Sequence, residues 1–587
     1  MAKAGRSKAM TSTAGASNGR RLGAREATQP ETVVAAVVTC AFLIGGWMLP
    51  LAALFQRAFF PAGFAPGSGV SAVTSVSTAL GGNVTSTSAA VAGAAASLPS
   101  IGFAAVFADP LVLAIVRATA WQALISTIIS AAIGLGLGLW VGNLSWRRAP
   151  GAAAARFFLR LPYTIPTVVV GVTGVVWLGR SGLLGQWGWQ TDWLFTLKAV
   201  IGAHVFLNAP WVALGVCEAR EQLPVAPWEA ARTLGADART RFRTLLWPYI
   251  SSAFAQRCIQ VYSLCAMSFV LVLLLGGGPP VETLETAIYG RIRYQSLDLT
   301  GALACALWQL LITLGPWFLI LFFRRRARTL PAGRGPAARP GDRRQSAVAA
   351  AACAAFVIPY AALLGPAFWR VCAHLVSDLD ARAEVLHSLW LSIGLAAGAS
   401  LGAVLFAASA VVWASALQRQ GRHGRGAILQ VLMSVPNGIS ALVLGLGFWL
   451  AYSRWVDPFE GSVTSMISLQ AILFSPIVFR TLWPLAERSQ TAALEAARTL
   501  GVGRLGAWRV VEWPRFRGPL AGVAGLVAGA ALGEVAAVSL FYSENLIPLP
   551  LLLTRWMAQY HFEEAQAVSV LLLGLAAFTL LISEKRA

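Results

Sequence analysis

The chain has 587 residues, of which 57% are hydrophobic and only 12% are charged. Soluble domains carry about 25% charged residues, so the composition excludes a soluble globular protein and indicates a polytopic membrane protein. The net charge of +21 does not indicate nucleic-acid binding, because the arginines fall in short stretches between apolar runs. The seven cysteines and five histidines show no metal-ligand spacing, and we expect neither a metal site nor a cofactor.

The chain begins with a polar, basic segment, residues 1–30, which predicts a disordered cytoplasmic tail. An organelle transit peptide is the alternative interpretation of this tail. Pro61–Pro110 is rich in Ala, Ser, Thr and Gly, and Asp109 is its only charged residue. We interpret it as an external loop, with a further helix near Ala89–Phe107 as the alternative.

Long apolar runs predict an all-α protein with about twelve transmembrane helices, six in each half of the chain. In the first half they are Thr32–Phe55, Leu111–Val141, Thr164–Leu178, Leu194–Val216, Tyr249–Leu275 and Gly301–Phe323. In the second half they are Ala347–Phe368, His387–Leu417, Val431–Tyr452, Met466–Leu482, Gly518–Phe541 and Ala567–Ile582. Residues 324–345 are basic and rich in Pro and Gly, which predicts a flexible cytoplasmic linker. We therefore expect transmembrane domains at 31–323 and 346–587.

The loops between the apolar runs alternate in charge. Arginines gather after the second and fourth runs, whereas the loop after the fifth run is mixed or acidic, with Glu282, Glu285, Arg291 and Asp298. Under the positive-inside rule, this alternation predicts that both chain termini lie in the cytoplasm, together with the two repeated stretches that follow the fourth run of each half.

These stretches are EAARTLGADARTRFRTLLWP at Glu229–Pro248 and EAARTLGVGRLGAWRVVEWP at Glu495–Pro514. Their first seven letters are identical, and the offset between them, 495 − 229, is a little under half of the chain. A period this long indicates two similar halves. Because the predicted number of spans per half is even, the repeats would be parallel, related by an axis along the membrane normal, with any pathway between them.

Each copy predicts a short helix, a break and a second helix that ends at a Trp-Pro pair. Gly235 and Gly501 fall at the breaks, where a left-handed residue would end the first helix. An amphipathic hairpin on the membrane surface is the plain alternative for either copy alone. Two near-identical copies at matching places disfavour it, since surface hairpins need no repeated sequence.

The paired EAA-x3-G stretches resemble the cytoplasmic loop of the permeases of type I ABC importers, in which this loop is the coupling helix that seats in a groove on the ATPase. The resemblance places such loops at 218–250 and 484–516. The coupling positions that it implies are Glu229, Ala230, Ala231, Gly235, Glu495, Ala496, Ala497 and Gly501.

The fused length resembles the thiamine and ferric-iron permeases, and most closely the thiamine permeases, as do the segments Cys265–Leu311 and Ala531–Leu573. The long basic tail, the Ala/Ser/Thr-rich loop and Glu534, at a place associated with Asp, depart from that pattern. The resemblance implies a permease in the bacterial inner membrane that takes thiamine, or next ferric iron, from a periplasmic binding protein to the cytoplasm. Its partners would be two copies of a cytoplasmic ABC ATPase, the periplasmic binding protein and the lipid bilayer, with no nucleic acid.

The chain contains no GxxxxGK[ST] sequence, and hence no P-loop to bind nucleotide phosphates. We therefore expect no catalytic residues and no enzymatic activity of the chain itself, with ATP hydrolysis left to the partner. A twelve-helix ion-coupled secondary transporter is the alternative. It accounts for the spans but not for the paired stretches.

Glu534 is an acidic residue inside an apolar run. A carboxylate there is energetically costly and usually faces a bundle interior or a cavity. Its counterpart at the repeat offset is Ser268, since 534 − 268 equals 495 − 229, so a pathway between the halves would be asymmetric. The sequence favours two interpretations of Glu534: a contact for a cationic substrate, or a hydrogen-bonded residue beside a helix kink at Gly533.

Overall fold

The computed structural model describes residues 30–59, 106–326, 342–355, 379–488 and 496–586, apart from short gaps within these ranges. In this part of the chain all regular structure is helical, and only two isolated bridges, Gly278–Val281 and Ser543–Leu546, have β-type pairing. The all-α prediction is confirmed. Residues 1–29, most of the predicted external loop and most of the linker lie outside the described residues.

The helices of the two halves follow one another in the same order. The first half contains α2 (Pro30–Leu43), η1 (Ile44–Met48), α3 (Leu49–Phe59), α7 (Pro110–Trp146), α8 (Ala152–Thr164), α9 (Thr167–Leu178), α11 (Leu197–Glu221), α12 (Val225–Thr233), α13 (Ala238–Arg241), η3 (Phe242–Leu246), α14 (Trp247–Ala266), η4 (Val272–Gly276), α15 (Leu284–Arg293) and α16 (Leu299–Arg326). The second half contains α17 (Asp342–Ala354), α19 (Leu379–Arg419), α20 (His423–Leu432), η5 (Val435–Gly438), α21 (Ala441–Tyr452), α22 (Val463–Arg488), α24 (Arg504–Ala507), η6 (Trp508–Glu512), α25 (Trp513–Leu532), α26 (Ala536–Ser539), α27 (Leu549–Ala558) and α28 (Phe562–Arg586).

The helix boundaries repeat at the offset of the sequence. The differences 504 − 238, 508 − 242 and 513 − 247 all equal 495 − 229, so α24, η6 and α25 copy α13, η3 and α14. In both copies a π-turn ends directly before the Trp-Pro pair. Proline lacks the N–H that would bond to residue i−4, and its ring crowds that carbonyl. The wider π-turn therefore lets the helix continue past the proline, and it does so in the same way in both copies.

Within the described residues, seven helices are long and apolar enough to cross a membrane, or nine if each of two bent pairs is one span. The bent pairs are α8 with α9, and α20 and η5 with α21, and the second pair turns by 105°. The prediction of one continuous span at Val431–Tyr452 is wrong, because Pro436 lies in the bend and disfavours helix for the residue before it. Pro166 has the same place before α9.

Two further expectations from the sequence are wrong in detail. The spans predicted at Tyr249–Leu275 and Gly518–Phe541 do not continue as single helices, since α14 ends at Ala266 and α25 ends at Leu532. The segment predicted to be a loop after the fifth span contains α15, which starts with a capping box at Thr283. A ten-residue helix with charged residues has no clear hydropathy signal, so packing against the rest of the molecule stabilises it.

The first helix of each half packs on the other half. The helix Thr32–Ala58 contacts α19 and α21, where the Tyr452 hydroxyl donates a hydrogen bond of 2.8 Å to the Gly45 carbonyl. In exchange, α17 packs against α8 and α7 of the first half. The packing units of the fold are thus not the two continuous stretches of sequence, since each unit takes its first helix from the other half.

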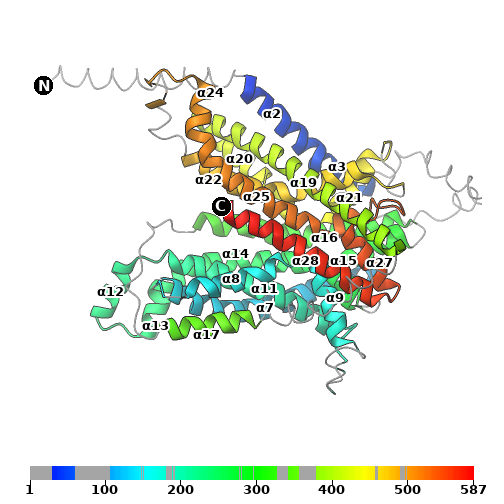
Figure 1. Ribbon diagram of the computed structural model, residues 1–587, viewed down its shortest axis with the longest axis horizontal. Helices are drawn as coiled ribbons and strands as arrows, with labels where there is room; N and C mark the ends of the chain where they lie inside the picture. The colour runs from blue at the N-terminus through cyan, green and yellow to red at the C-terminus, as the bar shows by residue number, and fades with distance from the viewer. Residues whose placement is uncertain are drawn as a thin grey trace, which may run out of the picture.

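The two halves meet along a seam at one end of the molecule. There α9 packs against α27 and α28, and α21 packs in the equivalent way against α15 and α16. The largest buried apolar cluster draws on both halves, with Val172, Leu275, Leu442 and Phe541 among its members. Figure 1 shows α9, α15 and α27 at this end and α12, α13 and α24 at the opposite end.

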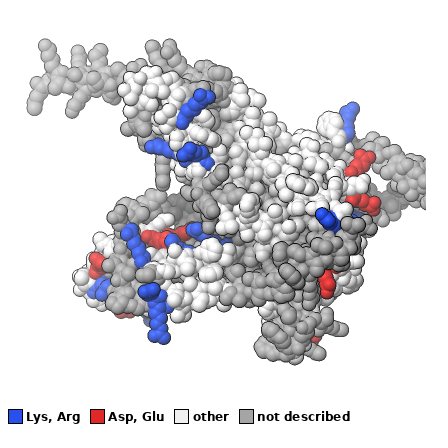
Figure 2. Space-filling model, in the orientation of Figure 1, with Lys and Arg blue, Asp and Glu red and all other residues white. Residues whose placement is uncertain are grey.

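At that opposite end the halves form two arms that stand apart (Figures 1 and 2). The described charged side chains gather toward the two ends of the face in Figure 2 and leave the middle mostly uncharged. A belt without charges is what a membrane-embedded surface requires. The ends with α12 and α24 on one side, and α15 and α27 on the other, therefore lie at the two membrane surfaces.

Candidate functional site

The first EAA stretch forms an exposed helix with a defined end. Glu229 and Ala230 on α12 are exposed, and Ala231 is half-buried. Gly235 has a φ of +74°, and the N–H of Ala236 donates to the Ala231 carbonyl at 2.9 Å. This is the left-handed glycine and the six-to-one hydrogen bond of a Schellman motif.

The second stretch ends in the same way. Gly501 has a φ of +76°, and the N–H of Val502 donates to the Ala497 carbonyl at 3.0 Å. Ala496 is exposed and Ala497 is half-buried. Glu495 lies outside the described residues. The backbone is thus the same in both copies at those predicted coupling positions that the structure describes.

Both copies leave a large apolar side chain uncovered. Leu234 is 85% exposed and Leu500 is 81% exposed, at matching positions just before the two glycines. A Cβ added to Gly235 or Gly501 would meet nothing within 4 Å. Because α12 and α24 lie at the same end of the molecule (Figure 1), the chain presents two copies of one surface on one side.

The first copy is joined to the transmembrane helices by a stack that the sequence did not reveal. The Arg220 guanidinium, at the end of α11, lies 3.9 Å from the ring centroid of Trp146 and 4.8 Å from that of Trp228. The two indole rings meet edge to face at 5.7 Å, and Trp146 donates its N–H to the Leu223 carbonyl at 2.9 Å. Trp228 directly precedes Glu229, so the stack fixes α12 to the ends of α7 and α11.

The duplicate lacks the residues of this stack. At the repeat offset, Ala486 corresponds to Arg220 and Leu494 to Trp228. The one signal in the sequence that could have indicated the stack is the tryptophan beside the first EAA letters. Its partners stand at the ends of two other helices, α7 and α11, and only the structure brings the three side chains together.

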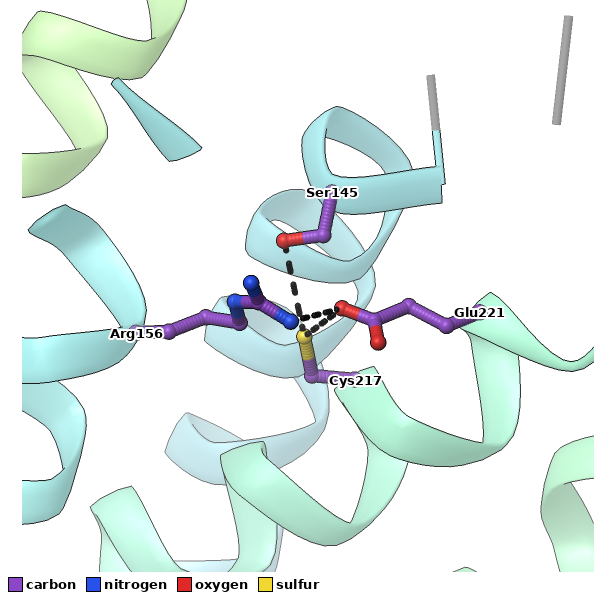
Figure 3. Close-up of polar contacts among 4 residues, drawn as sticks. All are labelled: Ser145, Arg156, Cys217 and Glu221. Carbon is purple, nitrogen blue, oxygen red and sulfur yellow. Dashed lines mark hydrogen bonds and ion pairs between the residues drawn. The ribbon is translucent and has the colours of Figure 1, made fainter. Parts of the chain in front are cut away.

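A second polar contact joins α8 to the same end of α11 (Figure 3). Arg156 forms an ion pair of 2.9 Å with Glu221, and the Cys217 thiol lies 3.6 Å from the same carboxylate oxygen and 3.9 Å from the Ser145 hydroxyl. The ion pair is partly exposed, so its contribution to stability is about 0.2–1 kcal/mol. It holds the bent pair α8–α9 to the helix that leads into the coupling stretch.

Glu534 lies at the opposite end of α25 from the coupling stretch. Its Oε1 accepts the backbone N–H groups of Ala536 and Ala537 at 2.9 and 3.3 Å, so it caps the short helix α26. Hydrogen bonds of this kind belong to the second interpretation made from the sequence, in which Glu534 is a hydrogen-bonded residue beside a helix kink at Gly533. The carboxylate also lines a narrow recess together with Ser392, Gln470 and Pro550.

Ser268 occupies the equivalent place after α14. The N–H of Ser268 bonds to the Cys265 carbonyl at 3.3 Å, just as the N–H of Glu534 bonds to the Ala531 carbonyl at 3.3 Å. Next to Glu534, a Cβ on Gly533 would lie 2.8 Å from Cβ of Pro166. The helix breaks after α14 and α25 therefore match each other, and the second one touches the other half of the chain.

Part of this arrangement is similar to a family of known transport proteins. Residues 134–329 match the family described as "Binding-protein-dependent transport system inner membrane component". This stretch runs from the middle of α7 to the end of α16 and includes the first EAA copy. Over this third of the chain the protein is similar to the inner-membrane components of binding-protein-dependent importers, and the fused length and duplicated helical fold are consistent with two such domains.

Individual relatives match over most of the chain. It is 28% identical over 495 residues, or 82% of this chain and 88% of the relative, to the "Thiamine transport system permease protein ThiP" of Brucella abortus (strain 2308). It is 25% identical over 508 residues to the protein of the same name from Escherichia coli (strain K12), covering 83% of this chain and 91% of the relative. A shorter relative is the "Sulfate transport system permease protein CysT" of Salmonella typhimurium, 29% identical over 203 residues, covering 34% of this chain and 72% of the relative.

Proposed function

We propose that this permease imports thiamine. The observation that carries the proposal is the similarity to thiamine permeases, which covers more than four-fifths of this chain and of the relatives from Brucella abortus and Escherichia coli. Thiamine is thereby favoured over ferric iron, the other substrate suggested by the sequence. In the proposal, residues 31–323 and 346–587 supply the two permease units, which exchange their first helices.

Two ATPase subunits would bind the two EAA surfaces. The exposed Leu234 and Leu500, each next to a Schellman glycine, support this assignment, because a large uncovered apolar side chain at a docking surface gains free energy when a partner covers it. Glu229, Ala230 and Ala231, and in the duplicate Glu495, Ala496 and Ala497, would lie in the contact. This end of the molecule, with both chain termini, would face the cytoplasm.

A periplasmic binding protein would deliver substrate at the opposite end, near α15 and α27. The pathway would lie between the halves, and Glu534 and Ser268 are its proposed lining residues. In the first half, the Arg220–Trp228 stack would transmit a movement of α12 to α7 and α11. In the second half, η6 runs directly into α25, which ends beside Glu534.

The test is uptake of radiolabelled thiamine into proteoliposomes that contain the permease and its ATPase, with the binding protein outside. We expect uptake only when ATP is trapped inside and the binding protein is present. Uptake that persists without ATP, driven by an ion gradient, would support the secondary transporter instead. If no thiamine is taken up even at a saturating concentration of binding protein, thiamine is not the substrate.

A further inference from the structure

Glu285 is a buried carboxylate for which the described part of the chain supplies no hydrogen-bond partner of standard geometry. It lies on α15, is 1% exposed, and neither of its carboxylate oxygens has a hydrogen-bond partner among the described residues. Ser440, the N-cap of α21 in the other half, lies next to it without completing a hydrogen bond, and accepts the N–H of Val443 at 3.2 Å. An isolated buried carboxylate is costly, and within a membrane protein it marks a functional site.

A second carboxylate lies near Glu285 and comes from the other half of the chain. Glu534 lies within electrostatic range of Glu285, and it shares its recess with Gln470. The side-chain oxygen of Gln470 is also buried without a partner among the described residues, since its NH₂ group donates to the Ala531 carbonyl at 3.2 Å. The seam between the halves thus gathers two carboxylates and an amide oxygen, all of them acceptors.

An aromatic side chain follows Glu285 one turn along α15. Glu285, Tyr289 and Arg293 are spaced one helical turn apart and therefore share one face of the helix. Tyr289 packs edge to face on Phe269 at 5.0 Å. Arg293 donates to the carbonyls of Leu540 and Tyr542 at 2.9 and 3.1 Å. The arginine thus holds the outer end of the seam together through backbone oxygens of the other half.

Carboxylates beside aromatic faces are the groups that bind organic cations. Two carboxylates in a low-dielectric seam repel each other when no ligand is bound, and a monovalent cation between them would offset this repulsion. We propose that Glu285 and Glu534 together form a subsite for an organic cation on the pathway between the halves. The proposal rests on the proposed function only in taking thiamine, whose thiazolium ring is permanently charged, as the first cation to test.

The duplication indicates that this subsite is formed once. The starts of α15 and α27, Leu284 and Leu549, match to within one position of the repeat offset, so Pro550 corresponds to Glu285 as the second residue of its helix. Ser268 corresponds to Glu534 at the offset itself. Each half therefore contributes one carboxylate from a different element, and the equivalent place across the seam has neither. A single cation is held by both halves at once.

The experiment compares the wild type with Glu285→Gln, Glu534→Gln and the double variant in the reconstituted transporter. Glu544→Gln, a change at an exposed carboxylate between α26 and α27, is the matched control. At limiting thiamine we expect uptake by the double variant to fall at least about tenfold, with the control unchanged. Purified permease in nanodiscs should bind thiamine but not its neutral derivative thiochrome, and the double variant should lose thiamine binding.

Glutamine has nearly the volume of glutamate. At position 285 it removes a buried charge without a hydrogen-bond partner, and at position 534 its amide oxygen can still accept the N–H groups of Ala536 and Ala537, so the variants should melt close to the wild-type temperature or above it. If the wild type takes up thiamine and the double variant transports and binds thiamine within about twofold of the wild type, the subsite is overturned and the proposed function stands. Absence of wild-type thiamine uptake would overturn the proposed function, and choline then serves as the cation. Choline binding that the double variant loses supports the subsite; choline binding that it keeps, or no binding of either cation by the wild type, refutes it.

Discussion

The two Schellman glycines offer the sharpest test of the coupling surfaces. Gly235 and Gly501 have φ values of +74° and +76°, and an added Cβ at either would meet nothing within 4 Å. A substitution therefore strains the backbone without creating a clash inside the chain. For a residue with a Cβ, the left-handed conformation costs about 1–2 kcal/mol, and a β-branched side chain is affected most.

A free-energy cost of about 1–2 kcal/mol lowers the population of the native turn by roughly five- to thirtyfold relative to the alternatives. We therefore expect Gly235→Val and Gly501→Val each to reduce ATP-driven uptake by at least about fivefold, while expression and insertion stay normal. Asparagine tolerates the left-handed region, so Gly235→Asn should keep most of the activity. The measurement is thiamine uptake in proteoliposomes at equal amounts of inserted protein.

Gly421 provides the matched control. It has a φ of +71° and open space around an added Cβ, and the N–H of Arg422 donates to the Leu417 carbonyl at 2.9 Å. The same motif thus ends α19, outside the EAA stretches. If Gly421→Val lowers uptake as much as Gly235→Val does, the effect is general strain and the reasoning about coupling is refuted. Normal uptake in both EAA variants would refute it as well.

Three further outcomes can be measured in the same system. Leu234→Asp combined with Leu500→Asp should abolish co-purification of the ATPase, because it places charges on both exposed apolar contacts; retained co-purification would place the ATPase elsewhere. Trp228→Ala removes contacts worth about 0.5–2 kcal/mol and should slow uptake while ATPase binding persists, whereas loss of binding would contradict a transmitting role for the Arg220 stack. Tyr452→Phe removes the hydrogen bond to the first helix and should lower the free energy of unfolding by about 0.5–1.5 kcal/mol, visible as a reduced melting temperature; an unchanged melt would mean that the exchanged helix is held by apolar packing alone.

Local sequence signals predicted the backbone of the two EAA stretches. A glycine that follows a run of helix-forming residues indicates a left-handed helix end, and both Gly235 and Gly501 adopt it. Pro166 and Pro436 lie at the bends before α9 and α21. The sequence could not give the size of the bend, because the angle depends on what the following helix packs against, and α21 packs on elements from both halves.

Long-range packing explains the features that the sequence analysis missed. The Tyr452–Gly45 hydrogen bond joins the second half of the chain to the first helix of the first half. Because these residues are far apart in the sequence, no local pattern indicates the exchange of first helices. The sequence groups Glu285 with loop residues because charged neighbours obscure the short apolar pattern of α15. Its burial follows from the docking of α15 on α21, which no window along the chain can show.

The duplication explains the fold, and its divergence explains where specific chemistry has entered. Matching backbone at Gly235 and Gly501 is needed if two copies of one ATPase bind alike, so these positions stay equivalent. A pathway for a single small solute has no such requirement, and there the halves differ: Glu285 and Glu534 correspond to proline and serine in the duplicate. A symmetric pair of sites would place four carboxylates around one monovalent cation, and the surplus charge would be costly in a low-dielectric seam. Loss of symmetry at the seam, with symmetry kept at the coupling surfaces, is therefore what a two-motor, one-substrate importer requires.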